Sequence, residues 1–218
     1  MVFSKLIQLM LINVRLIFCI FFLNLFLINV IWAQPWHFVK ETDGIKIYTR
    51  NEPNSSLKSY KGEVIFHAPM QKTCSMIGNA RNIDWWGPEF MNIKVLAYED
   101  KKFVQYYYTY DMPWPFTDRD IAVNATVKSD TANGEYSVLS LPLLKTVPEK
   151  PDLVRIKNYW QRWTIKPLDH GNVQLTLEGI VDPGGNVPAW LYNMLVTEMP
   201  IKTIHSFRAR VLSPKPAN

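Results

Sequence analysis

The sequence contains little cysteine, and this scarcity limits how the protein can be stabilised. Its two cysteines are Cys19 and Cys74, and Cys19 lies in an apolar N-terminal run. Without that run, Cys74 has no partner for an internal disulfide, so stability must come from a hydrophobic core. Methionine and isoleucine residues surround Cys74, which indicates a small buried side chain rather than a reactive thiol.

Histidine is also scarce, and clusters of metal ligands are missing from the sequence. The four histidines are scattered, and none has a neighbour at the spacing of a metal ligand. The sequence also lacks a Ser-His-Asp order, a glycine-rich phosphate loop and a cysteine cluster. We therefore predict no catalytic residue, no metal and no cofactor.

A strong excess of charge is missing as well. The formal net charge is +5, and it falls to +3 if a leader that carries Lys5 and Arg15 is removed. A balance this weak does not favour a nucleic-acid partner. The apolar content of the chain is therefore the better guide to the class of partner.

The first 33 residues differ in composition from the rest. Lys5 and Arg15 are their only charges, and a nearly continuous apolar run over residues 16–33 ends at Ala33. This order is typical of a secretory signal peptide cleaved after Ala33, with translation starting at Met1 or at Met10. The alternative is an uncleaved membrane anchor, since about 18 apolar residues can span a bilayer. We expect the mature protein to be periplasmic or secreted, or, on the alternative, anchored in the membrane by this segment.

The remaining chain is rich in apolar and aromatic residues. Hydrophobic residues make up 48% of the sequence and aromatic residues 13%, which is enough for a large core. The length fits a single domain over residues 34–213, followed by a flexible tail over residues 214–218. We expect this domain to be monomeric.

Alternating apolar and polar residues predict a protein dominated by strands. The pattern indicates a β-hairpin that turns at Asp43-Gly44. Between the third and fourth strands we expect a helix from Pro69 to about Asn79 and a short helical turn over residues 82–86. Further strands are predicted over residues 57–68, 92–98, 103–111, 118–128, 136–143, 154–165 and 173–181. Short turns join most of them, so the sheet should be antiparallel.

One long helix is predicted at the C-terminal end, beginning at Pro188. Asn186 is its expected N-cap, and Pro188 suits the first turn of a helix. Apolar residues continue to Val211 at helical spacing, so the helix must bury one face against the strands. Pro200 is a candidate hinge inside it. The predicted fold class is α+β: a curved antiparallel sheet around the long C-terminal helix, with an internal apolar cavity.

Several ordered motifs resemble those of one family. They are the segments Asp43-Gly44-Ile45-Lys46-Ile47-Tyr48-Thr49-Arg50, Pro113-Trp114-Pro115, Asp118-Arg119-Asp120, Trp163-Thr164-Ile165-Lys166-Pro167 and Asp182-Pro183-Gly184-Gly185-Asn186-Val187-Pro188-Ala189-Trp190-Leu191. In order and spacing the mature chain resembles the START (lipid-transfer) domain, and within it the exported bacterial members. The resemblance implies the helix-grip fold and binding of a lipid or another hydrophobic molecule. The family's N-terminal helix is absent or vestigial here. The inward positions 121–127 carry no charge, so the resemblance points to no particular sterol.

The loop over residues 112–117 is the first candidate functional segment. Two prolines restrict its backbone, and the resemblance places it at the mouth of the cavity. Trp114 and Phe116 would then gate the cavity or touch a membrane transiently. The alternative is that both rings pack on the C-terminal helix and stabilise the loop.

Arg119 is the charged candidate, because its position in the alternation matches inward-facing Ile121 and Val123. It should need a carboxylate partner, for which Asp84 is the candidate. The alternative is contact with the head group of a ligand.

The full predicted ligand-binding set combines these residues with aromatic and apolar ones from the strands and the last helix. It comprises Trp85, Tyr106, Tyr108, Trp114, Phe116, Arg119, Val123, Trp163, Trp190, Met194 and Leu195. Two other hypotheses compete with lipid binding. An enzyme acting on an apolar substrate would have to use Arg119, Asp84 or Glu178, and an interaction module would fill the cavity with its own aromatic rings.

Overall fold

The computed structural model describes residues 34–77, 83, 85–130 and 134–213, and these belong almost wholly to one compact unit, Pro35–Asn218. The predicted signal peptide, residues 78–82 of the predicted helical region, Asp84 and the predicted tail lie outside the described residues. Within the described part, no helix combines the length and apolar composition needed to cross a membrane.

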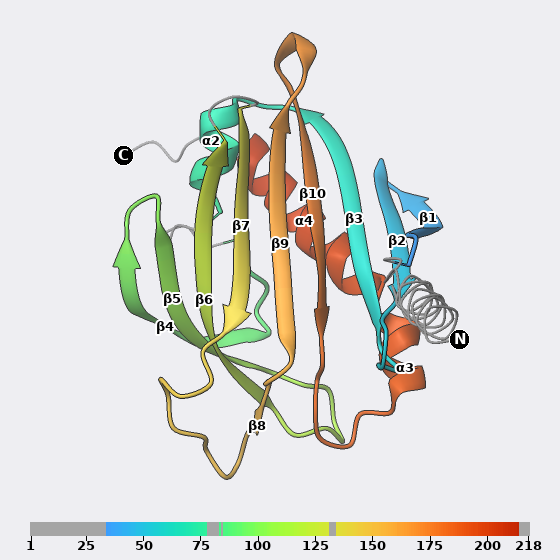
Figure 1. Cartoon of the computed structure of the whole chain (residues 1–218), viewed down its shortest axis with the longest axis vertical. Helices are drawn as coiled ribbons and strands as arrows, with labels where there is room; N and C mark the ends of the chain where they lie inside the picture. Colours follow the sequence, from blue (N-terminus) through green and yellow to red (C-terminus); the bar gives the residue numbers. More distant parts are fainter. Residues whose placement is uncertain (1–33, 78–82, 84, 131–133, 214–218) are drawn as a thin grey trace, which may run out of the picture. The chain divides into compact units, whose positions relative to one another are not determined.

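Ten strands form one sheet in this part of the chain (Figure 1). Neighbouring strands follow the order β1-β2-β3-β10-β9-β7-β6-β5-β4 and are antiparallel, while β8 pairs in parallel with β6. The strands are β1 (His37–Thr42), β2 (Ile45–Asn51), β3 (Lys58–His67), β4 (Phe90–Glu99), β5 (Phe103–Tyr110), β6 (Arg119–Asp130), β7 (Glu135–Pro142), β8 (Val154–Arg155), β9 (Tyr159–Pro167) and β10 (Asn172–Val181).

The strands largely follow the predicted alternation. The first hairpin turns at Asp43 and Gly44, both with positive φ, as the sequence pair predicts. One prediction is wrong: residues 154–165 form not one strand but two, β8 and β9. Residues 156–158 separate β8, which pairs with β6, from β9, which pairs with β10. One straight strand could not pair with both neighbours.

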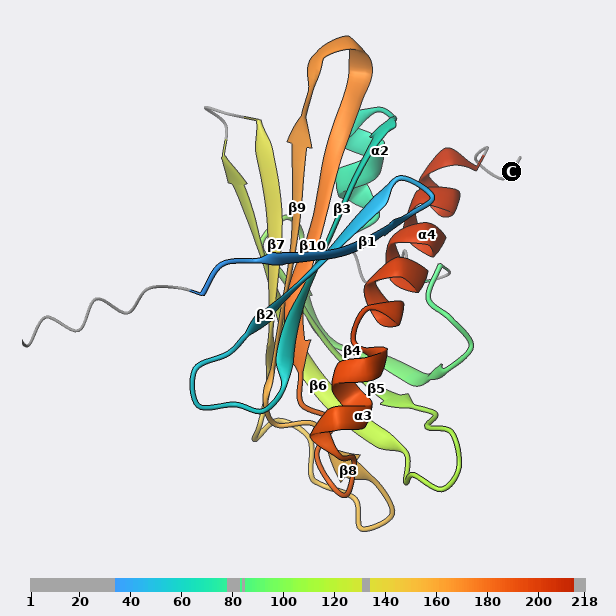
Figure 2. The ribbon, with the colours of Figure 1, turned by 90° about the vertical axis from the view of Figure 1, so that its right-hand side faces the viewer.

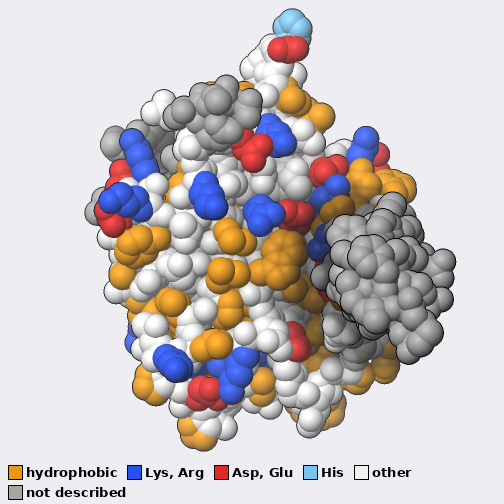
Figure 3. Space-filling model, in the orientation of Figure 1, with side chains coloured by type: hydrophobic (Ala, Val, Ile, Leu, Met, Phe, Trp, Pro, Cys, Tyr) orange, Lys and Arg blue, Asp and Glu red, His pale blue; other side chains and the backbone are white. Residues whose placement is uncertain are grey.

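The helices lie on one side of the sheet (Figure 2). They are α2 (Met70–Ser75), α3 (Ala189–Leu195) and α4 (Glu198–Leu212), with a 3-10 turn, η1, at Asp169–Gly171 between β9 and β10. Pro69 is the N-cap of α2, close to the predicted start, but the helix ends at Ser75 and not near Asn79 as predicted. The other face of the sheet carries apolar side chains mixed with Lys, Arg, Asp and Glu (Figure 3). The predicted α+β helix-grip fold is confirmed.

The C-terminal helix is not one continuous helix, which corrects the prediction. Pro188, not Asn186, occupies the N-cap of α3, and α3 ends before α4 begins at Glu198. Pro200 accounts for the interruption, because it has no N–H to offer the carbonyl of Val196 and its ring crowds that carbonyl. Pro200 therefore lies in the first turn of α4, at the boundary between the two helices, and its role as a hinge stays a prediction.

Gly62 allows α4 to approach the sheet closely. A Cβ atom at this position would lie 2.5 Å from Cδ1 of Ile204, and 3.5 Å from Cβ of Pro200. Ile204 and Phe207 of α4 are fully buried on this surface. The main core consists of the inward residues of the strands together with these helix residues, namely Ile45, Ile47, Tyr60, Val64, Phe66, Val104, Val138, Trp163, Ile165, Leu175, Leu177, Ile204, Phe207 and Val211.

Candidate functional site

An aromatic cluster fills part of the space between the sheet and α4. The ring of Trp85 lies 5.7 Å from Trp163 of β9 and 5.3 Å from Phe207 of α4, between ring centroids. Trp163 and Phe207 are themselves 5.2 Å apart, and both are buried. Trp85 and Trp163, two predicted ligand-binding residues, thus come together in the interior, where they contact each other.

A second aromatic cluster continues from Trp86 to β5. The ring of Trp86 lies 5.5 Å from Tyr106 and 5.6 Å from Tyr108, and these two tyrosines stack on each other. Phe90 adjoins both Trp86 and Tyr108. The predicted residues Tyr106 and Tyr108 therefore share one inward face, but Trp86 and Phe90, which the predicted set omits, complete their surroundings.

Tyr106 and Tyr108 lie in the interior, but their side chains are not completely buried. Loss of hydration raises the pKa of Tyr106 to about 12 and that of Tyr108 well above 10. Each side chain nevertheless remains half-buried and retains accessible surface. Beside them lies an apolar group of Ile121, Val123, Ile156 and Tyr159, in which the predicted residue Val123 is fully buried.

Gln161 organises a buried hydrogen-bonding group that the sequence analysis missed. Its amide oxygen accepts hydrogen bonds from Nε1 of Trp163 and the hydroxyl of Tyr159, both at 3.2 Å. Its amide nitrogen donates to the hydroxyl of Tyr60 at 3.0 Å. The strand alternation held the signal, because Gln161 is a polar residue in phase with inward-facing Tyr159 and Trp163.

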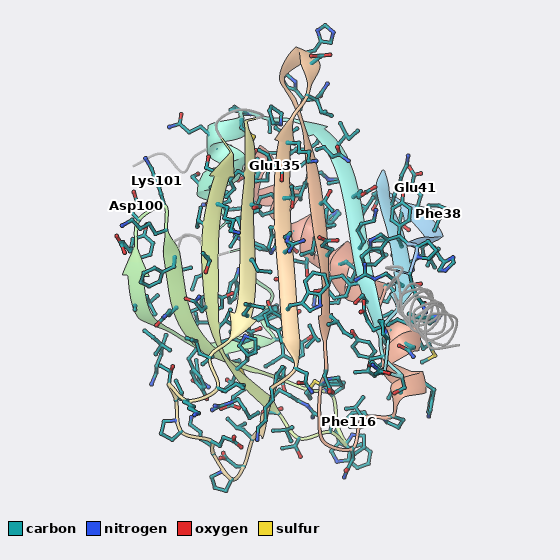
Figure 4. All side chains as sticks on the ribbon, in the orientation of Figure 1. Phe38, Glu41, Asp100, Lys101, Phe116 and Glu135 are labelled. Carbon is teal, nitrogen blue, oxygen red and sulfur yellow. The ribbon has the colours of Figure 1, made fainter. Side chains whose placement is uncertain are left out.

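Four predicted residues lie on the surface instead of lining the interior. Trp114, in the loop between β5 and β6, is 92% exposed, and Trp190 of α3 is 68% exposed. Met194 and Leu195 of α3 are also exposed. Phe116, which is half-buried, lies at the end of the sheet that carries the β5–β6 loop (Figure 4). We call Trp114, Trp190, Met194 and Leu195 the apolar rim.

Arg119 is buried, but it lacks the predicted carboxylate partner among the described residues. Its guanidinium donates to the carbonyl oxygens of Pro183, at 3.0 Å, and Gly184, at 3.1 Å, and to that of Thr117. Burial lowers the pKa of Arg119, and the charge of Asp118 opposes this change. The predicted pairing with Asp84 concerns a residue outside the described part. Arg119 links the β5–β6 loop to the turn before α3.

Two pockets open away from this interior. One, of about 400 Å³, is lined by residues of the β7–β8 region and of the turn after β10, including Arg155 and Asp182. The other, of about 520 Å³, is lined mostly by outward residues of β7, β9 and β10, including Leu141 and Trp160. Glu178, a candidate for the enzyme hypothesis, belongs to the second and pairs with Arg162 at 3.1 Å. It therefore does not face the aromatic clusters.

Comparison with known proteins agrees with this architecture. An uncharacterised protein of Pseudomonas aeruginosa is 28% identical over 178 residues, 81% of this chain and 87% of that protein. The phosphatidylcholine transfer protein of Rattus norvegicus is 26% identical over 168 residues, 74% of this chain and 76% of that protein. A solved fragment (25–204) of a STAR-related lipid transfer protein from Xanthomonas axonopodis has a TM-score of 0.74 and 28% identity, covering 82% of this chain and 99% of that one.

The family assignment follows from the extent of the match as well as from the fold. The sequence model of the START domain matches residues 33–216, which include every strand and helix described above. The matched residues contain the whole described sheet, its helices and the Trp-Pro loop between β5 and β6. The chain belongs to the START domain family.

Proposed function

We propose that this protein binds a lipid or a similar hydrophobic molecule between the sheet and helices α3 and α4, and carries it without catalysis. The family is one of lipid-binding and lipid-transfer domains. The observation that carries the proposal is the accessible surface that Tyr106 and Tyr108 retain beside Trp86 in the deep interior. An apolar ligand would cover that surface.

Burial of the ligand supplies the binding free energy. Removing about 400 Å² of apolar ligand surface from water gives on the order of 10 kcal/mol at about 25 cal/mol per Å². Lost translational freedom and ordering of the surrounding side chains offset a large part of it. No charged group has to contribute, which agrees with the apolar character of Ile121, Val123 and Ile156.

Uptake of the ligand requires movement at the end of the domain that carries the apolar rim. The β5–β6 loop and the turn before α3 are joined there through Arg119. The exposed rings of Trp114 and Trp190 suit transient contact with a membrane, where Trp is favoured at the interface. We propose that this contact precedes separation of the two loops.

Arg119 is engaged by backbone carbonyls and Glu178 by Arg162, so neither supports the enzyme hypothesis. We propose that residues 1–33 direct the chain to the periplasm or out of the cell, where it acts as a monomer. An anchor that is not cleaved would hold the same domain at the membrane.

Native mass spectrometry of the full chain, incubated with a bacterial lipid extract and then freed of excess lipid, tests the proposal. We expect a lipid bound at near-stoichiometric amounts, which organic extraction identifies. Val123→Phe adds volume at the inner face of β6 and should abolish the bound lipid. Asn124→Phe places the same ring on the other face of β6 and should leave it unchanged. A folded wild-type chain that carries no lipid would contradict the proposal.

A further inference from the structure

We propose that Gln161 forms the polar end of the ligand site and selects an uncharged lipid whose head offers a single hydroxyl, carbonyl or ester oxygen. This inference rests on the proposed lipid-binding function and names the class of ligand. It excludes phospholipids and ionised fatty acids as preferred ligands.

Gln161 lies in a row of residues that crosses the inner face of the sheet. It pairs with Gly179 of β10 on one side and with Ser140 of β7 on the other, and Gly179 pairs in turn with Tyr60 of β3. A Cβ at Gly179 would lie only 3.0 Å from the hydroxyl of Tyr60. Glycine at this position therefore lets the phenol of Tyr60 reach across to Gln161.

The orientation of the Gln161 amide is fixed by its neighbours. The indole N–H of Trp163 can only donate, so the atom 3.2 Å away must be the amide oxygen. The hydroxyl of Tyr159 donates to the same oxygen, which uses both of its lone pairs. The amide nitrogen then faces Tyr60 and donates one of its two hydrogens to the hydroxyl of Tyr60.

One N–H of Gln161 therefore remains for a ligand, because the described residues offer it no second acceptor. Tyr60, Tyr159 and Trp163 are buried, whereas Gln161 is only half-buried. The buried rings hold the amide from behind, and its accessible side can meet a bound molecule. A donor in this position recognises an oxygen acceptor.

The surroundings disfavour a charged head. Among the described residues, no acidic or basic side chain hydrogen-bonds to this group. Burial raises the pKa of Tyr60 and of Tyr159, which shows that the region opposes negative charge. Arg119 does not offset this, since its guanidinium is bonded to the carbonyls of Thr117, Pro183 and Gly184. A buried phosphate or carboxylate would lack a counterion.

A competition experiment with four probes tests the inference on the full chain at pH 8. The probes are octadecane, methyl octadecanoate, octadecanoate and a phosphatidylcholine with octadecanoyl chains, all at equal concentration, with bound amounts read by native mass spectrometry. We expect methyl octadecanoate to exceed octadecane about tenfold, the factor that one hydrogen bond of about 1.4 kcal/mol gives. Octadecanoate and the phosphatidylcholine should bind less than the ester.

Two variants assign the preference to Gln161. Gln161→Met removes the donor at about the same side-chain volume, so the ratio of bound ester to bound hydrocarbon should fall to about one. Gln174→Met makes the same change in β10, on the other face of the sheet, and should keep the wild-type ratio. If Gln161→Met does not fold, the wild-type order of the four probes still decides.

The outcomes separate this inference from the proposed function. Preference for octadecanoate or the phosphatidylcholine overturns the inference and leaves lipid binding intact. So does a Gln161→Met protein that keeps the tenfold ratio. Failure to bind any of the four probes overturns lipid binding itself, and the inference with it.

Discussion

Arg155 donates two hydrogen bonds, each of 2.8 Å, to the carboxylate of Asp120. Both side chains are almost completely buried, and Tyr107 donates a third hydrogen bond to the same carboxylate at 3.1 Å. Arg155 also donates to the carbonyls of Val147 and Pro148. The pair therefore fixes the segment between β7 and β8 against β6.

Breaking this pair should strongly destabilise the protein. Arg155→Met leaves the buried carboxylate of Asp120 without its counterion, which costs about 3 to 5 kcal/mol of unfolding free energy. Urea denaturation of the wild type and the variant measures the difference. The double variant Asp120→Asn/Arg155→Met should lose much less than the sum of the two single changes, because no unpaired charge remains. Additive losses would contradict the pairing.

Arg119 should control both stability and ligand exchange. Arg119→Met removes the donors for the carbonyls of Pro183 and Gly184, and unsatisfied buried acceptors cost about 1 to 3 kcal/mol. We also expect release of bound lipid to accelerate severalfold, measured by transfer to acceptor vesicles. The matched control is Arg162→Met on the other face of the sheet, which should change stability by less than about 0.5 kcal/mol and leave release unchanged. Equal release rates for both variants would contradict the role of Arg119.

Gly62→Ala should move α4 away from the sheet. The added methyl group would meet Cδ1 of Ile204, and overpacking of a core costs about 1 to 3 kcal/mol. Ile204→Val removes that Cδ1 atom, so it should restore part of the stability in the double variant, although alone it costs about 0.5 to 1.5 kcal/mol. Thermal and urea unfolding of the four proteins check this. A double variant less stable than Gly62→Ala would show that the contact is not limiting.

Alkaline pH should weaken the fold in a defined window. The pKa of Tyr106 is raised to about 12 by burial, whereas a tyrosine in the unfolded chain ionises near about 10. Between these values the unfolded chain binds fewer protons, so the free energy of unfolding falls as pH rises through the window and is unaffected below about pH 10. Unfolding measured from pH 8 to 12 should show this fall, and Tyr106→Phe should reduce its slope. Tyrosinate absorbance that develops fully near pH 10 in the folded protein would contradict it.

The apolar rim should matter for membranes and not for stability. Trp114→Ala and Trp190→Ala remove rings that are largely exposed, so unfolding free energy should change by less than about 0.5 kcal/mol. Co-sedimentation with phosphatidylcholine–phosphatidylglycerol vesicles should become severalfold weaker. Ile65→Ala, an equally apolar change at an exposed position of β3, is the control. Loss of vesicle binding in this control as well would remove the rim from the proposal.

The strands and the family could be predicted from the sequence because their signals are local. Alternation along β6 places Ile121 and Val123 inward whatever lies opposite, and Asp43-Gly44 specifies its own turn. The division between α3 and α4 was also encoded locally, at Pro200, but the apolar stripe runs through it and favoured one helix. The boundary follows from a missing backbone donor, which side-chain periodicity does not record.

The partners of polar side chains could not be predicted, because they come from distant strands. The amide nitrogen of Gln161 reaches the hydroxyl of Tyr60 only when β3, β10 and β9 adopt their register. The buried guanidinium of Arg119 donates hydrogen bonds to backbone carbonyls, and the sequence has no signature for such contacts. The exposure of Trp190 was equally hidden, since α3 is short and has no buried residue in the structure.

The pairing of β3 with β10 has a consequence for how the domain is made. Tyr60 of β3 pairs with Gly179 of β10. The first three strands therefore join the rest of the sheet only through β10, the last strand. During synthesis the N-terminal hairpin and β3 must wait, unpaired on one side, until nearly the whole chain has emerged. Contacts this distant in sequence slow folding, and a premature stop anywhere before β10 leaves the edge of β3 open to other chains.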